Sequence, residues 1–276
     1  MAATLFDYSD LCLDAKTKKL NVALFSENHV MCGLTEQVIF DDPYFAAELN
    51  RHTSPQLDDI AADIRQDVAL KVAVQELKTL FMCKAQTLLH GDLHSGSIMV
   101  TEADSRVIDP EFAFYGPMGF DVGVFIANLL LAYFSQPGHA TSNDDREDYG
   151  QWILEALLQT YAVFEETFSQ KWRDQRTGSL YPETLFSSAN TAAIERAASR
   201  YLRDVMQDSI GFAGAEMVRR VLGIAHVEDL ETITDENLRA RCERKTLILG
   251  RTMIIDRKKF SDLNDVVCLA KTINQE

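Results

Sequence analysis

The alternation of hydrophobic and polar residues predicts a chain that is built mainly of helices. In the clearest stripe, Ile60, Ile64, Val68 and Val72 recur every four residues, which is the repeat of one helix face. We therefore expect one long helix over residues 57–88. Similar patterns predict helices over residues 10–25, 122–134, 149–172, 182–206, 210–225, 233–250 and 251–272, and one that starts at residues 41–43 with an aspartate cap.

Two short β-rich segments interrupt this helical pattern, at residues 97–101 and 106–108. Turn-forming residues at 103–105 separate them, so a β-hairpin is predicted. A hairpin of this length brings its two ends together, and Asp92 and Asp109 should then face each other across one site. The predicted fold class is mainly α (α+β), with one small hairpin that carries acidic residues.

Composition narrows the class of protein. The chain has 276 residues, of which 46% are hydrophobic, and this is enough for a sizeable core. Its net charge of −15 argues against non-specific binding to nucleic acid or to an anionic membrane, which needs a basic face. Five scattered cysteines suit free thiols in a reducing compartment. We see no signal-peptide pattern, and the apolar run 122–134 is shorter than the ~20 residues that span a bilayer. A cytoplasmic protein is therefore predicted.

Three acidic residues around the hairpin are candidates for chemistry. Carboxylates that lie close together repel one another unless a cation or a shared proton relieves them, and we expect a divalent metal. Asp109 and Glu111 would point to the same side of an extended segment, which suits Mg²⁺. Asp92 follows Gly91 in a loop and can point at a substrate hydroxyl. The alternatives are a turn-capping aspartate and two solvated surface acids.

His90 and His94 offer a zinc site as an alternative, but no third soft ligand is nearby and Gly91 argues against a helix there. We expect His90 to brace the loop through the backbone, and His94 to do the same or to line the pocket. Asp121 precedes the apolar run, and we expect it to cap the helix or to brace the loop through backbone N–H groups.

Arg219 and Arg220 lie within an apolar helical pattern. Neighbours on a helix differ in direction by about 100°, so at most one of them can face the core fully. A buried arginine needs a partner. This partner could be a carboxylate in a structural salt bridge, or a polar or phosphate-bearing substrate. The pattern does not decide between these two. For His226, on the same predicted helix, we expect a packed or capping role.

The chain resembles the aminoglycoside phosphotransferase/choline kinase group of protein-kinase-like enzymes, and most closely the methylthioribose kinase family. The motifs that carry the resemblance occur in order along most of the chain: LTEQVIFDDPYF at 34–45, LHGDLHSGS at 89–97, DPEFAFYGPMGFD at 109–121, and RRVLGIAH at 219–226. The resemblance implies ATP-dependent phosphorylation of S-methyl-5-thioribose to its 1-phosphate, a step of methionine salvage.

The resemblance also implies roles for single residues. Asp92 would be the catalytic aspartate and would bind the sugar hydroxyl, while Asp109 and Glu111 would hold Mg²⁺ on the ATP phosphates. Arg219 and Arg220 would contact the sugar or its developing phosphate. Such a division agrees with phosphoryl transfer, which depends on positioning and charge neutralisation.

Ser97 stands where related kinases often carry a metal-binding asparagine, and it is a weak ligand candidate. Two alternatives remain: a kinase of the same group that acts on choline or an aminoglycoside, which the arginine pair disfavours, and a non-catalytic lobe that binds a sugar or a partner protein. The sequence leaves the oligomeric state open, with a homodimer as one option.

Family members also carry an N-terminal strand-rich lobe with a phosphate-covering loop and a lysine. This chain has neither a Gly-x-Gly-x-x-Gly nor a Walker A motif. We therefore expect residues 1–276 to form the C-terminal lobe of a kinase-like enzyme without its N-terminal lobe, with a truncated gene product as the favoured explanation. The catalytic loop and metal site would occupy residues 88–121, and a helical substrate-binding part residues 122–276.

Overall fold

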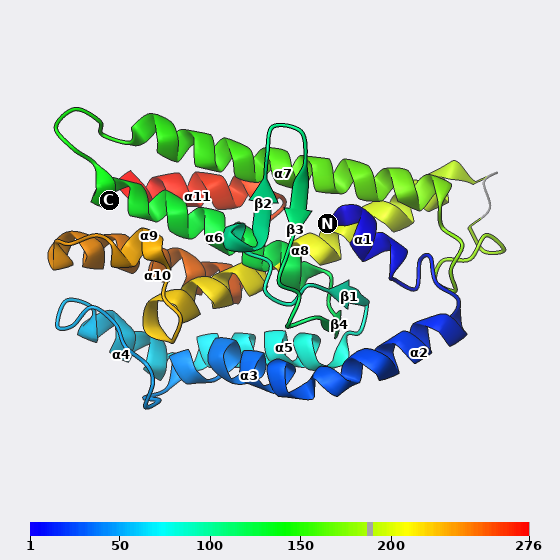
Figure 1. Cartoon of the computed structure of the whole chain (residues 1–276), viewed down its shortest axis with the longest axis horizontal. Helices are drawn as coiled ribbons and strands as arrows, with labels where there is room; N and C mark the ends of the chain where they lie inside the picture. Colours follow the sequence, from blue (N-terminus) through cyan, green and yellow to red (C-terminus); the bar gives the residue numbers. More distant parts are fainter. Residues whose placement is uncertain (187–189, 276) are drawn as a thin grey trace.

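The computed structural model describes residues 1–186 and 190–275, and the fold is dominated by helices, as predicted (Figure 1). The helices are α1 (Ala2–Asp7), α2 (Ala15–Phe25), α3 (His29–Phe40), α4 (Asp58–Gln66), α5 (Val68–Cys83), α6 (Gly119–Ser135), α7 (Glu147–Asp174), α8 (Thr191–Leu222), α9 (Glu228–Glu231), α10 (Glu236–Asp256) and α11 (Leu263–Gln275). The strands are β1 (Thr87–Leu89), β2 (Ile98–Val100), β3 (Ser105–Val107) and β4 (Phe114–Gly116).

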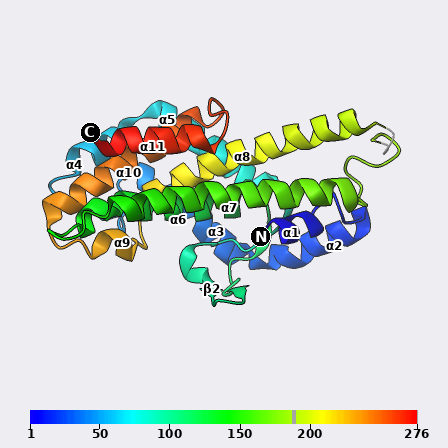
Figure 2. The same cartoon turned by 90° about the horizontal axis from the view of Figure 1, so that it is seen from above.

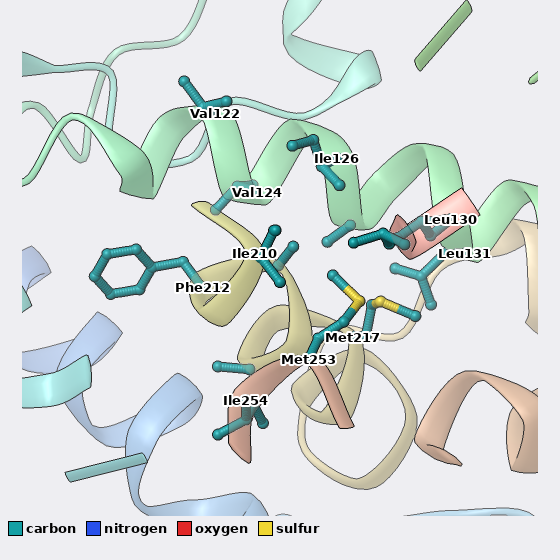
Figure 3. Packing of buried hydrophobic residues seen from close by; sticks show 14 of the residues in the cluster. Val122, Val124, Ile126, Leu130, Leu131, Ile210, Phe212, Met217, Met253 and Ile254 are labelled. Atoms are coloured by element: carbon teal, nitrogen blue, oxygen red, sulfur yellow. The ribbon is translucent and has the colours of Figure 1, made fainter. Parts of the chain in front are cut away.

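The core forms where α6, α8 and α10 cross. Side chains from all three helices point into one apolar cluster (Figure 3). The helices approach closely because glycines stand at the crossing points. A Cβ atom at Gly123 of α6 would lie 2.6 Å from the carbonyl oxygen of Ser209, and one at Gly214 of α8 would lie 2.5 Å from that of Gly250. These glycines of α6 and α8 thus allow the three helices to pack closely.

One apolar segment has the length and composition of a membrane span. It comprises residues Gly119–His139, but 78% of the apolar 18-residue stretch within it is buried inside the protein. The predicted helix over residues 122–134 is therefore longer than expected, and it is buried as expected. Its hydrophobic side chains pack against α8 and α10, which explains their apolar character without a bilayer (Figure 3).

The prediction of one long helix over residues 57–88 is wrong. Two helices, α4 and α5, occupy this range, and β1 follows them. Asp67 separates the helices because its extended backbone ends the first, while its side chain accepts the backbone N–H of Leu70 and caps the second. The four-residue stripe also breaks there, since Ile64 is buried whereas Val68 is 72% exposed.

Other helix boundaries also differ from the predictions. Residues 10–14 form turns before α2, and residues 42–44 form only a short 3₁₀ turn. The helices predicted over 210–225 and the later part of 182–206 are a single helix, α8, while residues 187–189 lie outside the described residues. The two helices predicted over 233–272 are α10 and α11, separated by a loop at 257–262.

The predicted β-hairpin is confirmed. β2 and β3 pair antiparallel, with Ile98 opposite Val107 and Val100 opposite Ser105. The hairpin projects from one side of the helical body (Figure 2). A second small sheet was not predicted: β1 and β4 pair antiparallel just before and just after the loops that carry the acids. The two loops are therefore connected to each other at both ends.

Candidate active site

The side chain of Asp121 holds the loop that follows β1 in place. This carboxylate is almost fully buried near the start of α6, and it accepts the backbone N–H groups of His90 at 2.7 Å and of Gly91 at 2.9 Å. Burial raises the pKa of Asp121, while these two hydrogen bonds act in the opposite direction. The prediction that Asp121 braces the loop through backbone N–H groups is confirmed.

The same loop lies directly against the segment that carries Asp109. The ring nitrogen Nε2 of His90 lies 2.8 Å from the carbonyl oxygen of Ile108, so the bracing role predicted for this histidine is also confirmed. Gly91 has a φ of +87°, and a Cβ atom there would overlap the carbonyl group of Phe112. Glycine is required here because the two segments touch and the backbone is left-handed.

Asp92 is partly exposed, and two basic side chains lie close to it. Its Oδ1 atom lies 3.6 Å from Nη2 of Arg220, and its Oδ2 atom lies 3.7 Å from Nε2 of His94. The hydroxyl of Ser97 is turned toward the backbone, 3.3 Å from the carbonyl oxygen of Asp92. The loop therefore presents the carboxylate of Asp92 beside a guanidinium, and Ser97 supports the loop.

Asp109 and Glu111 are both exposed. Asp109 has a φ of +65°, and Glu111 lies in a turn, so the extended geometry predicted for the pair is wrong. The side chain of Asn28 positions this segment, since its amide donates to the carbonyl oxygens of Glu111 at 2.9 Å and of Ala113 at 3.0 Å. That the Asp92 and Asp109 carboxylates face each other remains a prediction.

The two acids fit a hard cation. Neither side chain takes part in a hydrogen bond or an ion pair with another described residue, so Asp109 and Glu111 are free to bind one. Within residues 1–186 and 190–275, no group of three or more His, Cys, Asp or Glu side chains is placed to hold a metal ion. This disfavours the zinc alternative for His90 and His94. It is compatible with Mg²⁺, which takes one or two carboxylates and completes its shell with phosphate oxygens and water.

The arginine pair near the end of α8 shares one buried carboxylate that the sequence reasoning missed. Glu216 is 2% exposed; its oxygens accept Nη1 of Arg219 at 2.9 and 3.1 Å, and Oε1 accepts Nε of Arg220 at 2.5 Å. Burial alone would raise the pKa of Glu216, yet the two guanidinium groups hold it at about 2. The spacing i, i+3 and i, i+4 on a helix is the signal that could have identified this residue.

The turn after α8 also contacts the arginines. Nη1 of Arg220 donates to the carbonyl oxygen of Ala225 at 2.7 Å, and Ala225 has a φ of +56°. Nε2 of His226 lies 3.0 Å from the carbonyl oxygen of Gly223, so the predicted capping role of this histidine is confirmed. Burial lowers the pKa of His226, and the charge of Arg51 lowers it further.

The motif at residues 34–45 lies against this same turn. A Cβ atom at Gly223 would lie 3.4 Å from the ring of Pro43. Beside Pro43, the hydroxyl of Tyr44 is buried and has no hydrogen-bond partner among the described residues, and the same is true of Nε of Arg219. Three separated motifs of the sequence, at 34–45, 89–97 and 219–226, therefore meet around Asp92 and the arginines.

Three features point to a phosphotransferase: the helical fold, the hairpin that carries acids, and the guanidinium beside a loop aspartate. The chain belongs to the phosphotransferase enzyme family, whose sequence profile matches residues 24–166. This range includes Asp92, Asp109 and Glu111 but ends before the arginine pair.

Individual relatives extend the match over the whole chain, and they are methylthioribose kinases. The chain is 44% identical to methylthioribose kinase 1 of Oryza sativa subsp. japonica over 278 residues, which cover 100% of this chain and 64% of that protein. It is 44% identical to the methylthioribose kinase of Escherichia coli O45:K1 over 98% of this chain and 64% of that protein. The match to the Yersinia enterocolitica enzyme is 40% over 97% of this chain and 63% of that protein. The chain therefore spans about 64% of the length of these relatives.

Proposed function

We propose that this chain carries the sugar-binding and catalytic face of an ATP-dependent kinase for S-methyl-5-thioribose. The relatives are named methylthioribose kinases. The reaction would be transfer of the γ-phosphoryl group of ATP to the 1-hydroxyl of the sugar. The observation that carries the proposal is the placement of Arg220 Nη2 only 3.6 Å from Asp92 Oδ1. A carboxylate that can accept the hydroxyl proton and a guanidinium that can bind phosphoryl oxygens thus lie side by side.

Each residue has a separate part in this proposal. Asp92 orients the 1-hydroxyl and accepts its proton as the hydroxyl oxygen bonds to the γ-phosphorus and the bond to the ADP oxygen breaks. Arg219 and Arg220 bind the sugar or the negative charge of the transferring group, for which the guanidinium fork is suited. These parts match what a loose transition state needs, which is positioning and charge neutralisation.

Asp109 and Glu111 would hold Mg²⁺ on the phosphates of ATP. When bound, the ion neutralises phosphate charge. The support from the chain itself is that both carboxylates are exposed and are not taken by another described residue. Asn28 and the contact between His90 and Ile108 fix the backbone of this segment, so the backbone that carries the two acids is held in place.

We further propose that residues 1–276 act as the C-terminal lobe of the enzyme, with the catalytic loop and metal site at 88–121 and the substrate-binding part at 122–276. A strand-rich lobe would complete the nucleotide site. The partner is a small molecule; a nucleic acid or a membrane would not suit the net charge of −15. Free thiols at all five cysteines suit the cytoplasm. A homodimer remains one option for the assembly.

A phosphorylation assay with a matched pair of variants tests the proposal. Asp92→Asn removes the carboxylate while the loop and its contacts stay in place. Asp104→Asn is the control, since Asp104 is an exposed acid at the tip of the same hairpin. We expect ATP-dependent turnover of methylthioribose to fall by ~10²-fold or more in Asp92→Asn and to stay unchanged in Asp104→Asn. Turnover that survives in Asp92→Asn would exclude the role assigned to Asp92.

Calorimetry separates the competing functions. A choline or aminoglycoside kinase would bind its cationic acceptor in preference to methylthioribose. A non-catalytic lobe would bind methylthioribose without any affinity for ATP·Mg²⁺. Binding of both methylthioribose and ATP·Mg²⁺ is the result that the proposed kinase function requires.

A further inference from the structure

All three nitrogens of the Arg220 guanidinium have a defined neighbour. Nε donates to Glu216 at 2.5 Å, and Nη1 donates to the carbonyl oxygen of Ala225 at 2.7 Å. Nη2 faces Asp92 at the longer distance of 3.6 Å. Two short hydrogen bonds therefore fix the plane of the fork, and the nitrogen that is not held by them is the one that faces the proposed reaction centre.

Glu216 lies among apolar and small residues of α8, between the buried Ala215 and Met217. A buried carboxylate destabilises a fold strongly unless it is paired and hydrogen-bonded. Here it is paired with both arginines, and no other described residue shares its oxygens. The free-energy cost of burying Glu216 and its pairing with both arginines together indicate that its function is to hold these arginines.

The turn after α8 adds a second holding group in a strained conformation. Ala225 adopts the left-handed region, which is unfavourable for a residue other than glycine. This conformation directs its carbonyl oxygen to Arg220. Such strain persists only where the surrounding structure enforces it, and functional sites are where it is commonly found.

We propose that Glu216 is a positioning residue that, together with the carbonyl group of Ala225, holds the Arg220 fork with Nη2 directed at Asp92 and the transferring phosphoryl group. The inference rests on the proposed kinase function for its chemical meaning, and on the geometry alone for the positioning itself. Nothing in the reaction requires Glu216 to contact the substrate. It acts through Arg220.

Glu216→Gln tests the positioning because the amide keeps the size of the side chain and removes its charge. Its oxygen can still accept from one arginine, but its NH₂ group would face the other guanidinium. We expect kcat for methylthioribose to fall ~10- to 100-fold, the effect of displacing a reacting group by about 1 Å, while KM for ATP stays constant. Glu216→Asp keeps the charge on a shorter side chain and should recover part of kcat.

Two comparisons distinguish positioning from a merely structural role. Asp208→Asn is the matched control: it removes another buried carboxylate of α8, one that pairs with Lys84 and lies about 18 Å from Arg220 along the helix. It should leave kcat unchanged. In an Arg220→Lys background, Glu216→Gln should lower kcat by less than it does in the wild-type chain, because of the two arginines that Glu216 holds only Arg219 remains. Additive losses in the double variant would overturn the inference.

A readout without substrate keeps this inference separate from the proposed function. Phenylglyoxal modifies accessible arginines, and peptide mass spectrometry reports the rate at each position. We expect Arg220 to react faster in Glu216→Gln than in the wild-type chain and in Asp208→Asn. If the wild-type chain does not phosphorylate methylthioribose but Arg220 reacts faster in Glu216→Gln, the proposed kinase function is refuted. The inference that Glu216 positions Arg220 then stands. If Arg220 reacts at the wild-type rate in both Glu216→Gln and Glu216→Asp, the positioning is refuted.

Discussion

Replacing Asp121 by asparagine would test how the loop that carries Asp92 is held. The wild-type carboxylate accepts two backbone N–H groups, from His90 and Gly91, in an almost fully buried position. Asparagine has nearly the same shape but only one oxygen. It would keep one of these hydrogen bonds and place its NH₂ group against the other backbone donor.

The magnitude follows from these bonds. A buried N–H group left without an acceptor costs ~1–3 kcal/mol, and the bond that remains loses its charge-assisted share of about 1 kcal/mol. Burial raises the pKa of Asp121, so removing its charge returns part of this loss. We therefore expect Asp121→Asn to lower the free energy of unfolding by ~1–3 kcal/mol, and Asp121→Ala, which leaves both N–H groups unpaired, to lower it by more.

Urea unfolding followed by circular dichroism measures this change, and hydrogen exchange locates it. In Asp121→Asn, the amide of His90 or of Gly91 should exchange faster than in the wild-type protein, while amides in the core of α8 keep their relative protection. A variant as stable as the wild-type protein, with both amides still protected, would refute the reasoning, because it would show that the loop does not depend on the carboxylate.

Three further predictions concern the backbone and the turn after α8. Gly91→Ala should destabilise the fold by ~3 kcal/mol or more in urea unfolding, since the added methyl group overlaps Phe112 at a positive φ. Ala225→Gly should raise the unfolding free energy by ~0.5–1 kcal/mol, because glycine adopts the left-handed region without strain. Burial and the charge of Arg51 lower the pKa of His226, so the unfolded state binds its proton more tightly and stability should fall as pH decreases below about 6.5. Unfolding at pH 7.5 and 5.5 should show this loss in the wild-type protein and a smaller one in His226→Gln.

The fold could be predicted where a pattern had one physical meaning. The β-rich pieces around a turn could form only a hairpin, and the run of apolar residues after Asp121 could only be buried. The stripe at 57–88 had two meanings, because its apolar residues fit either one continuing helix or a second helix that buries a different set of positions, among them Leu70 and Val74. Asp67 decided between them by capping, and its own sequence context gave no reason to prefer a cap over a surface position.

For the candidate site, the sequence identified the chemical groups better than it identified their supports. The loop aspartate, the acids and the arginines were identified from motifs. The residues that hold them, Asn28, Glu216 and Ala225, were missed, because each acts on a partner that the fold brings to it or through a backbone conformation. Asn28 contacts the acid segment across 83 residues of sequence, which no local pattern can indicate.

Left-handed backbone conformations occur in all three parts of the candidate site. Gly91, Asp109 and Ala225 all have positive φ values, and they lie in the loop that carries Asp92, in the acid segment and in the turn that contacts Arg220. Glycine adopts this region without strain and aspartate does so more readily than most residues, so Ala225 is the strained one of the three. Two of these conformations serve a contact with a neighbouring segment: Gly91 lets the loop touch Phe112, and Ala225 directs its carbonyl oxygen to Arg220. The buried carboxylates act at the same two places, since Asp121 accepts the backbone N–H group of Gly91 and Glu216 accepts Nε of Arg220, whose Nη1 donates to Ala225.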